Sequence, residues 1–362
     1  MKMKPFRLSN YLPSKVNILL RDYLWRDIAK RKIKSRNNNK TTTEIVFLSP
    51  ASVRAIGGIK VIYKCAEFIS QFGNDIHSSV YHLQKTKHRA KWFVSTCKIN
   101  KGIYFDPEYD FFVVPEVWAY DICPHLIEQG FNYAIFVQNG YHVLDTEYSD
   151  KIVSKVENVY LNASFVLSIS RDTSKLLNVL FPSISPNKII RQYPSVGEIF
   201  QPKSKENIIS YMPRKLPEHI RKICSLLTRV LPKSWKLVEI NNMSEIETAE
   251  VFSISSIFLS TCDQEGFCLP PLEAAVSGAL VVGYTGQAAS EFFRRPNFEE
   301  VNNGDMQDFV SKVISSIKNI ENGCLNTSEF KDGISFLKNN YSEYRQKDAL
   351  KEFVNSVKHK KP

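Results

Sequence analysis

Short apolar, β-branched segments alternate with helical stretches along most of this chain, and this alternation restricts the fold more than any other feature. Up to residue 194 the expected strands are EIVFLSP, DIHSSVYHL, DFFVVPE, NYAIFVQN, FVLSIS and NKIIRQYP. Apolar strands that are separated by helices are typical of a parallel sheet with helices on both faces. The first half of the chain is therefore predicted to be a doubly wound α/β unit.

The alternation restarts after a polar segment at 194–207, which carries Pro194, Gly197 and Pro202. Strands are expected at 208–212, 235–240, 256–261 and 279–284, with helices at 216–230, 244–252 and 270–277. The sequence thus predicts two doubly wound Rossmann-like domains that face a central cleft, where such sheets bind ligands. The expected divisions are a basic arm at 1–43, an N-terminal domain at 44–200, a C-terminal domain at 201–335 and a helical segment at 336–362, with a last helix at 348–358.

Composition and charge exclude several classes of protein. The 43% of apolar residues is too high for a disordered chain, and the longest apolar runs, such as 279–284, are too short to cross a bilayer. Of the net charge of +11, +10 belongs to residues 1–40, which carry twelve Lys and Arg but two Asp. The rest of the chain is nearly neutral, which argues against nucleic acid as a partner.

The basic arm has two interpretations. Leu19, Leu20, Tyr23, Leu24 and Ile28 recur at helical spacing before a charged stretch. An amphipathic helix of this kind binds an anionic membrane surface, which predicts a cytoplasmic protein that is peripheral on the membrane. The alternative is an ordinary terminal helix that packs on the domain and is followed by solvated charges.

The cysteines indicate the redox compartment. There are seven, an odd number, scattered and without a Cys-x-x-Cys pair. Secreted disulfide frameworks have even, clustered cysteines, so we expect reduced thiols in the cytoplasm. The start of the chain lacks the apolar core of a signal peptide. Neither Asp-x-Asp nor histidines at ligand spacing occur, so no metal and no other cofactor is expected.

The strongest local motif lies at Glu265-Gly-Phe-Cys-Leu-Pro-Pro-Leu-Glu273. It follows an expected strand and opens a helix, in whose first turn prolines are tolerated. Backbone amides at such a helix start bind phosphate, and two carboxylates would flank the anion. The alternative for Glu273 is a residue that faces solvent or the helix dipole.

The stretch from Glu265 to Phe293 resembles the donor-binding segment of the GT-B retaining glycosyltransferases of the fourth family. The shared parts are two glutamates separated by seven residues, Ser277-Gly278, Val281-Val282-Gly283, and a loop from Gly286 to Glu291. The resemblance implies that Glu265 contacts the donor sugar and Glu273 the ribose of the nucleotide. It also implies that the turn of Gly266, Phe267, Cys268 and Leu269 binds the donor, with its amides on the distal phosphate. Glu291 is expected to bind the donor as well. The alternative for Glu291 is a carboxylate at a helix N-terminus.

Two further segments fit the same resemblance. Arg214 and Lys215 follow the first strand of the second half, where the family places a basic pair that neutralises the leaving diphosphate. Gly57-Gly58 matches the loop after the first strand, where glycines allow close approach to the donor. The alternatives are surface charges for the basic pair and a simple turn for the glycines.

The acceptor side is predicted less sharply. The strand at 135–142 ends in Gln138 and Asn139 where many relatives carry histidine, and His142 follows. Glu116 and Asp121 follow another strand end. All five are acceptor-side candidates, with solvent-exposed loop positions as the alternative.

The resemblance implies a hexosyltransferase that moves a sugar from a nucleotide-diphosphate donor to a hydroxyl of a glycan or lipid-linked acceptor, with retention, in surface polysaccharide synthesis. A GT-B nucleotide-sugar epimerase and an inactive nucleotide-sugar-binding scaffold remain as alternatives. Base, sugar, acceptor and oligomeric state are left open by the sequence.

Overall fold

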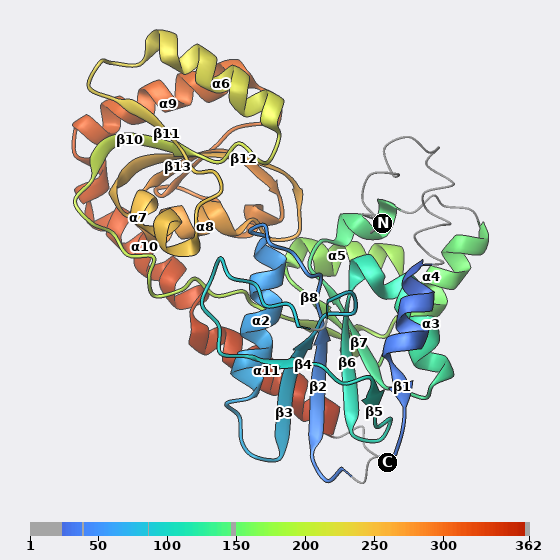
Figure 1. Ribbon diagram of the computed structural model, residues 1–362. Coiled ribbons are helices and arrows are strands. Elements are labelled where there is room, and N and C mark those ends of the chain that lie inside the picture. The colour runs from blue at the N-terminus through green and yellow to red at the C-terminus, as the bar shows by residue number, and fades with distance from the viewer. Residues whose placement is uncertain (1–23, 38–39, 86, 146–149, 359–362) are drawn as a thin grey trace, which may run out of the picture.

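Two α/β domains make up the computed structural model, which describes residues 24–37, 40–85, 87–145 and 150–358 (Figure 1). Within these residues the N-terminal domain has a seven-stranded sheet and the C-terminal domain a five-stranded sheet. All paired neighbours in both sheets are parallel among the described strands. The prediction of two doubly wound units is confirmed.

The N-terminal sheet has the order β4-β3-β2-β6-β7-β8-β9. Its strands are β2 (Thr43–Leu48), β3 (Ile76–Tyr81), β4 (Lys98–Asn100), β6 (Asp110–Pro115), β7 (Tyr133–Val137), β8 (Phe165–Ser168) and β9 (Ile189–Arg191). Its helices are α2 (Gly57–Ile69), α3 (Glu116–Glu128), α4 (Asp150–Asn162) and α5 (Arg171–Leu180). Beside this sheet, β1 (Lys34–Ser35) pairs with β5 (Tyr104–Phe105).

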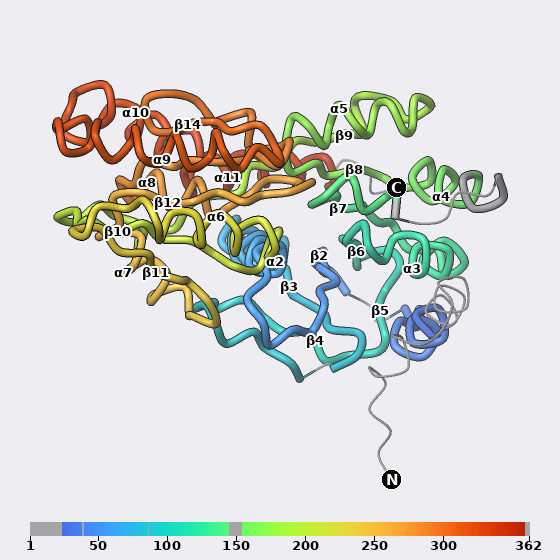
Figure 2. The backbone as a smooth tube through the Cα atoms, turned by 90° about the horizontal axis from the view of Figure 1, so that it is seen from above, coloured from blue at the N-terminus to red at the C-terminus, as the bar shows by residue number. Residues whose placement is uncertain are grey.

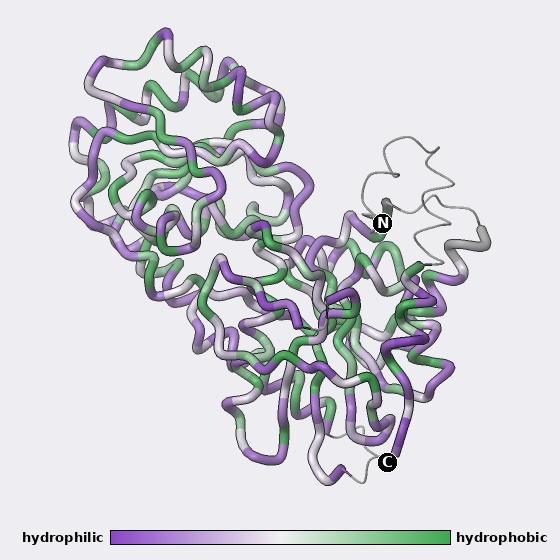
Figure 3. Tube along the Cα trace, in the orientation of Figure 1, coloured by the Kyte–Doolittle hydropathy of each residue, from purple (hydrophilic) through white to green (hydrophobic). Residues whose placement is uncertain are grey.

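The C-terminal sheet has the order β11-β10-β12-β13-β14. Its strands are β10 (Glu206–Tyr211), β11 (Lys236–Glu239), β12 (Ser255–Glu265), β13 (Leu280–Gln287) and β14 (Phe298–Glu300). Its helices are α6 (Pro217–Val230), α7 (Glu245–Ile254), α8 (Leu269–Val276), α9 (Met306–Glu321) and α10 (Ser328–Asn340). Helix α6 is amphipathic, because its buried residues Ile220, Ile223 and Leu227 share one face. Figure 3 shows hydrophilic residues between the hydrophobic ones along this helix.

The last helix, α11 (Glu343–Lys358), leaves the C-terminal domain and packs on α2 of the N-terminal domain (Figure 1). Its Phe353 ring lies 5.9 Å from that of Phe111 and 6.1 Å from that of Phe165. The helix starts five residues before the predicted 348, and the expected division at 335/336 falls inside α10. The chain therefore passes between the domains twice, once before the strands of the C-terminal sheet and once after them.

The basic arm lies only partly in the described chain, because residues 1–23 are outside it. Residues 24–32 form a helix that packs on α3, where the Trp25 and Trp118 ring centroids lie 4.5 Å apart and Ala29 is fully buried. This part fits the interpretation as a terminal helix on the domain. In the described chain, no helix is long and apolar enough to span a bilayer.

Three short strands were not among the predicted elements: β1, β5 and β14 have two or three residues each. The same is true of β4, which lies at the sheet edge. Such segments are too short for an apolar run to be read from the sequence.

Candidate active site

The predicted donor loop joins β12 to α8. Glu265 is the last residue of β12, and Cys268, at φ +57°, precedes the first residue of α8, Leu269. Pro270 and Pro271 occupy the first turn, as predicted, and no described side chain caps this helix start. The N–H groups of the turn and the positive end of the helix dipole therefore offer a site for an anion.

A disulfide bond joins Cys262 to Cys268. This corrects the prediction that the cysteines are reduced thiols. The prediction considered the number and clustering of the cysteines, whereas the strand-turn-helix geometry brings these two side chains together. The bond closes the loop that carries Glu265, and it leaves Cys268 with only its backbone to offer a ligand.

Lys215 lies in the loop between β10 and α6 and forms an ion pair with Glu265 Oε1. The Lys215 side chain is 43% exposed and the Glu265 side chain 21% exposed, so both remain accessible to a ligand. Glu265 Oε2 accepts no hydrogen bond from any described residue. Arg214, the other half of the predicted basic pair, is exposed and contacts none of the described acidic side chains.

Glu273 is the fifth residue of α8, two residues after Pro271, and faces the N-terminal domain. Its Oε1 is 2.8 Å from Lys60 Nζ, which also forms an ion pair with Glu245 at the start of α7. Burial alone would lower the pKa of Lys60, but the two carboxylates outweigh it and raise the pKa above its ordinary value. Glu273 Oε1 is held by Lys60, and Glu273 Oε2 accepts no hydrogen bond within the described chain.

The Gly57-Gly58 pair begins α2 and lies against two of the other predicted residues. A methyl group on Gly57 would come within 3.2 Å of Leu269 Cδ1, across the domain boundary. A methyl group on Gly58 would come within 2.5 Å of Gln138 Oε1. Both glycines thus permit close approach of these protein groups, because a side chain at either position would fill the space at the helix start. Their predicted contact with the donor stays a prediction.

Residues 138–139 contact the donor loop directly. The Asn139 side-chain amide donates to Gln264 O at 2.9 Å, and a side chain on Gly266 would collide with the Gln138 carbonyl. Because Gly266 follows Glu265, this contact places the predicted amide pair beside the first glutamate of the motif.

Glu116 accepts hydrogen bonds from the backbone of Gln138 and Asn139. It is the first residue of α3, and its two carboxylate oxygens accept the N–H groups of Gln138 at 3.2 Å and Asn139 at 3.0 Å. Burial raises the pKa of Glu116 to about 7, although these N–H groups oppose the shift. Its carboxylate is therefore engaged with the backbone, which differs from the predicted contact with an acceptor.

The other two acceptor-side candidates lie differently. His142 is exposed, within η1 (Gly140–Asp145), and near enough to Glu116 to influence its pKa. Asp121 is 2% exposed in the second turn of α3. The structure thus does not bring Asp121 to the surface that the acceptor would approach, because five residues of helix separate it from Glu116.

Glu291 joins the domains at another point. Its carboxylate accepts hydrogen bonds from the Arg191 guanidinium at 2.8 Å, the Arg171 backbone N–H at 2.9 Å and the Tyr341 hydroxyl at 3.1 Å. This geometry differs from the predicted contact with a donor, because both oxygens are taken by protein groups.

The predictions from sequence missed Lys60, Arg191 and the disulfide partner Cys262. Lys60 stands two residues after Gly58 in the first turns of the helix, and Arg191 ends a strand. Lys60 lies just after the glycine pair that the predictions placed at the cleft, and that proximity is the signal that would have identified it, whereas Arg191 lies inside a predicted strand, which gives no such signal.

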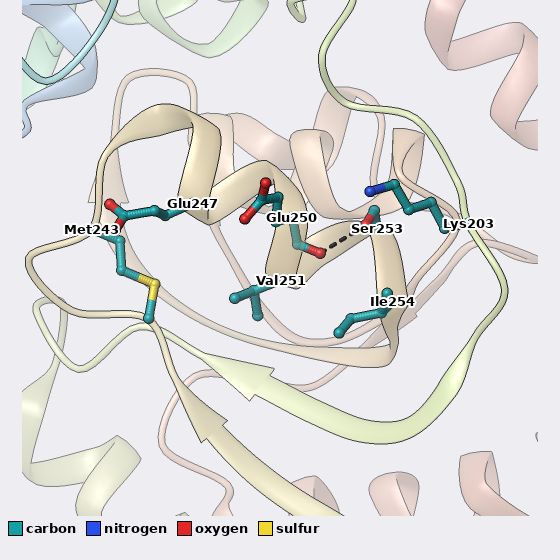
Figure 4. Close-up of a pocket in the computed structure, with 7 residues that line it drawn as sticks. All are labelled: Lys203, Met243, Glu247, Glu250, Val251, Ser253 and Ile254. Atoms are coloured by element: carbon teal, nitrogen blue, oxygen red, sulfur yellow. Dashed lines mark hydrogen bonds between the residues drawn. The ribbon is translucent and has the colours of Figure 1, made fainter.

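Two cavities of about 390 Å³ lie outside this site. Figure 4 shows one of them, on the side of α7, lined by Lys203, Met243, Glu247, Glu250, Val251, Ser253 and Ile254. Neither cavity includes Glu265 or Glu273. No group of three or more His, Cys, Asp or Glu among the described residues is arranged to hold a metal ion.

Comparison with known proteins adds independent evidence. No family model matches the chain. The chain is 25% identical over 246 residues to an alpha-1,6-glucosyltransferase of Actinobacillus pleuropneumoniae serotype 7 (strain AP76), which covers 63% of this chain and 69% of the relative. The predicted hexosyltransferase type of enzyme agrees with this relative.

Solved structures are similar over most of the chain. Sucrose-phosphate synthase from Thermosynechococcus elongatus superposes with a TM-score of 0.63 at 12% identity, over 88% of this chain and 99% of that one. Anabaena HepE in complex with UDP and glucose superposes with a TM-score of 0.64 at 10% identity, over 87% of this chain and 100% of that one. The chain therefore has the GT-B fold, and its predicted resemblance to the GT-B glycosyltransferases is confirmed.

Proposed function

We propose that this protein transfers a hexose from a nucleotide-diphosphate sugar to a hydroxyl group of a glycan or lipid-linked acceptor. The observation that carries the proposal is the pair of glutamates at the two ends of the α8 turn. Each has one oxygen held by a lysine, Lys215 or Lys60, and one oxygen without a described partner. Such carboxylates accept hydrogen bonds from sugar hydroxyls while the amides between them bind phosphate.

The division of roles follows from position. Glu265 lies at the strand end beside Gly266 and 138–139, so it would receive the donor sugar. Glu273 lies one turn into α8 and would receive the ribose, with Lys60 orienting its carboxylate. Lys215 and Arg214 would stabilise the negative charge that develops on the leaving diphosphate, with the α8 amides. No metal is needed for that neutralisation, so we propose none.

We further propose that the anomeric configuration is retained and that the acceptor belongs to a surface polysaccharide. The acceptor oxygen would attack the anomeric carbon on the face from which the diphosphate departs. The bond between that carbon and the β-phosphate oxygen breaks, and the acceptor proton passes to the departing phosphate oxygen. The protein would contribute positioning and charge stabilisation.

UDP-glucose is the first donor to test, because the relative is named a glucosyltransferase and HepE was crystallised with UDP and glucose. Purified protein is incubated with a panel of nucleotide sugars, with and without glycan acceptors, and nucleoside diphosphate release is measured. A transferase changes the donor only when an acceptor is present. An epimerase converts the donor sugar to its epimer without an acceptor, and a scaffold leaves the donor unchanged. NMR of the product gives its anomeric configuration.

Glu265→Gln should lower acceptor-dependent release by about a hundredfold or more, because it removes a charge beside the reacting centre. Glu352→Gln, an exposed change on α11, is the matched control and should be unaffected. Equal turnover of Glu265→Gln and wild type would contradict the assignment of this site.

A further inference from the structure

The second cavity lies in the N-terminal domain, between the 24–32 helix, α3 and α4. It has a volume of about 390 Å³ and is lined by Arg26, Tyr120, Pro124, Ser154, Lys155, Asn158 and Val159. Figures 1 and 2 both show these three helices gathered on one side of the domain. None of the residues in its lining belongs to the candidate active site.

Helix α3 connects the cavity to the candidate active site, because Glu116 begins this helix and Tyr120 and Pro124 further along it line the cavity. Tyr120 and Pro124 follow Glu116 at intervals of four residues, so they lie near the same face of the helix. At 1.5 Å per residue they are about 6 and 12 Å further along the axis. A molecule that reached both places would need an extension of that order.

The charged residues in the lining are both cationic. Arg26 and Lys155 line the cavity and no carboxylate does. Within the described chain, neither forms a hydrogen bond or an ion pair, and the Nε of Arg26 is buried without a partner. The Arg26 guanidinium lies 5.1 Å from the centre of the Tyr120 ring, which fixes its orientation.

Hydrogen-bonding groups complete the lining. Asn158 and Ser154 are one turn apart on α4. Asn158 Oδ1 accepts from Asn162, and the Asn158 side-chain N–H₂ remains as a donor in the lining. Two cations without an ionic partner among the described residues and an amide donor, with no acidic residue in the lining, form a site for a polyoxygen anion.

We propose that this cavity binds the phosphate group of a phosphate ester carried by a lipid. The basic residues 1–40 precede and include Arg26, and their charge raises the local concentration of anionic lipid. The same chemistry would accept a free phosphate, and the experiment separates the two sources. The proposal does not depend on the donor site.

The test is isothermal titration calorimetry on the full chain with two probes, inorganic phosphate and dihexanoyl phosphatidic acid. Arg26→Gln/Lys155→Gln should weaken binding by about tenfold or more, because two charge-assisted contacts are lost. Lys222→Gln/Arg229→Gln, exposed changes on α6, remove the same charge elsewhere and serve as the control. Lys155→Gln alone, an exposed change, gives a milder version if the double variant is unstable.

Binding of the lipid probe but not of inorganic phosphate, lost in the cavity variant and kept in the control, supports the lipid source. Equal binding of both probes with the same variant pattern assigns the site to a free phosphate. The proposal is overturned if neither probe binds the wild type, or if the cavity and control variants weaken binding equally. Donor turnover with a soluble acceptor, measured alongside, shows whether the active site is intact.

Discussion

Replacing Lys60 with methionine tests the buried ion cluster that links α2 to α7 and α8. The Lys60 side chain is 5% exposed, and those of Glu273 and Glu245 are 8% and 16% exposed. Methionine keeps most of the volume but removes the positive charge, so both carboxylates remain buried and lose their common partner. Breaking a buried pair in this way costs about 3–5 kcal/mol, and the second stranded carboxylate favours the upper end of that range.

The pH dependence follows from the signs of the pKa shifts. In the wild type, the raised pKa of Lys60 means that its stabilising effect is complete at neutral pH and is lost only as the pH rises through that pKa. The variant lacks this contribution at every pH. Its deficit in the free energy of unfolding should therefore be full at pH 7.5 and smaller at about pH 11, above the ordinary lysine pKa of 10.5.

Urea unfolding followed by circular dichroism, at both pH values, measures the free energy of unfolding. Lys64→Met is the matched control on the same helix. Lys64 pairs with Glu343 at 2.8 Å, but their side chains are 20% and 35% exposed, so its loss should cost about 1 kcal/mol or less. A Lys60→Met deficit no larger than that of the control, or one that is unchanged at the higher pH, would refute the reasoning.

Three further predictions concern the loop around Glu265 and its support. Glu116→Gln should lower kcat/KM by about tenfold, because the two N–H groups bond to different carboxylate oxygens and glutamine replaces one of these oxygens with an N–H₂ donor. It should also abolish a wild-type rise in kcat/KM through pH 7, the region of the raised Glu116 pKa. Cys262→Ser should cost about 2 kcal/mol in urea unfolding, because it opens the short loop closed by Cys268. Gly266→Ala should lower kcat/KM by about tenfold or more, because its methyl group would collide with the backbone carbonyl of Gln138 and displace it from the donor loop.

Matched controls separate these effects from general damage. Glu128→Gln changes an exposed carboxylate on the same helix as Glu116 and should leave the pH profile unaltered. Cys324→Ser removes a free thiol. Gly102→Ala places a methyl group near the side chain of Asn100, which can move away. A flat wild-type pH profile, or controls that match their test variants, would contradict the corresponding prediction.

The sequence predicts the architecture because strands that are buried on both faces consist of uninterrupted runs of apolar residues. β2, β6, β7 and β13 are of this kind, and each lies within or close to its predicted range. Edge strands such as β4 have three residues and an exposed face, so their hydrogen bonds with a neighbour define them and the residue pattern does not.

The candidate site divides in the same way. The local motif predicts the turn between Glu265 and Glu273, because a helix start and its flanking residues are close in sequence. Lys60 and Arg191 approach their glutamates across the domain boundary, from 213 and 100 residues away, and no local pattern carries that information. The sequence predicts that Glu116 lies near the acceptor side. Its contacts with the N–H groups of Gln138 and Asn139 come from residues 22 and 23 positions away, so no local pattern predicts them.

The return of α11 to the first domain has a consequence for synthesis on the ribosome. Phe111 and Phe165 are made early, yet the Phe353 ring that covers them belongs to the last helix. At about 5–20 residues per second, the growing chain takes roughly 7–30 s to pass from residue 200 to α11. Throughout that interval the apolar strip that α11 covers in the finished protein lacks this helix, and exposed apolar surface of this kind favours association between nascent chains.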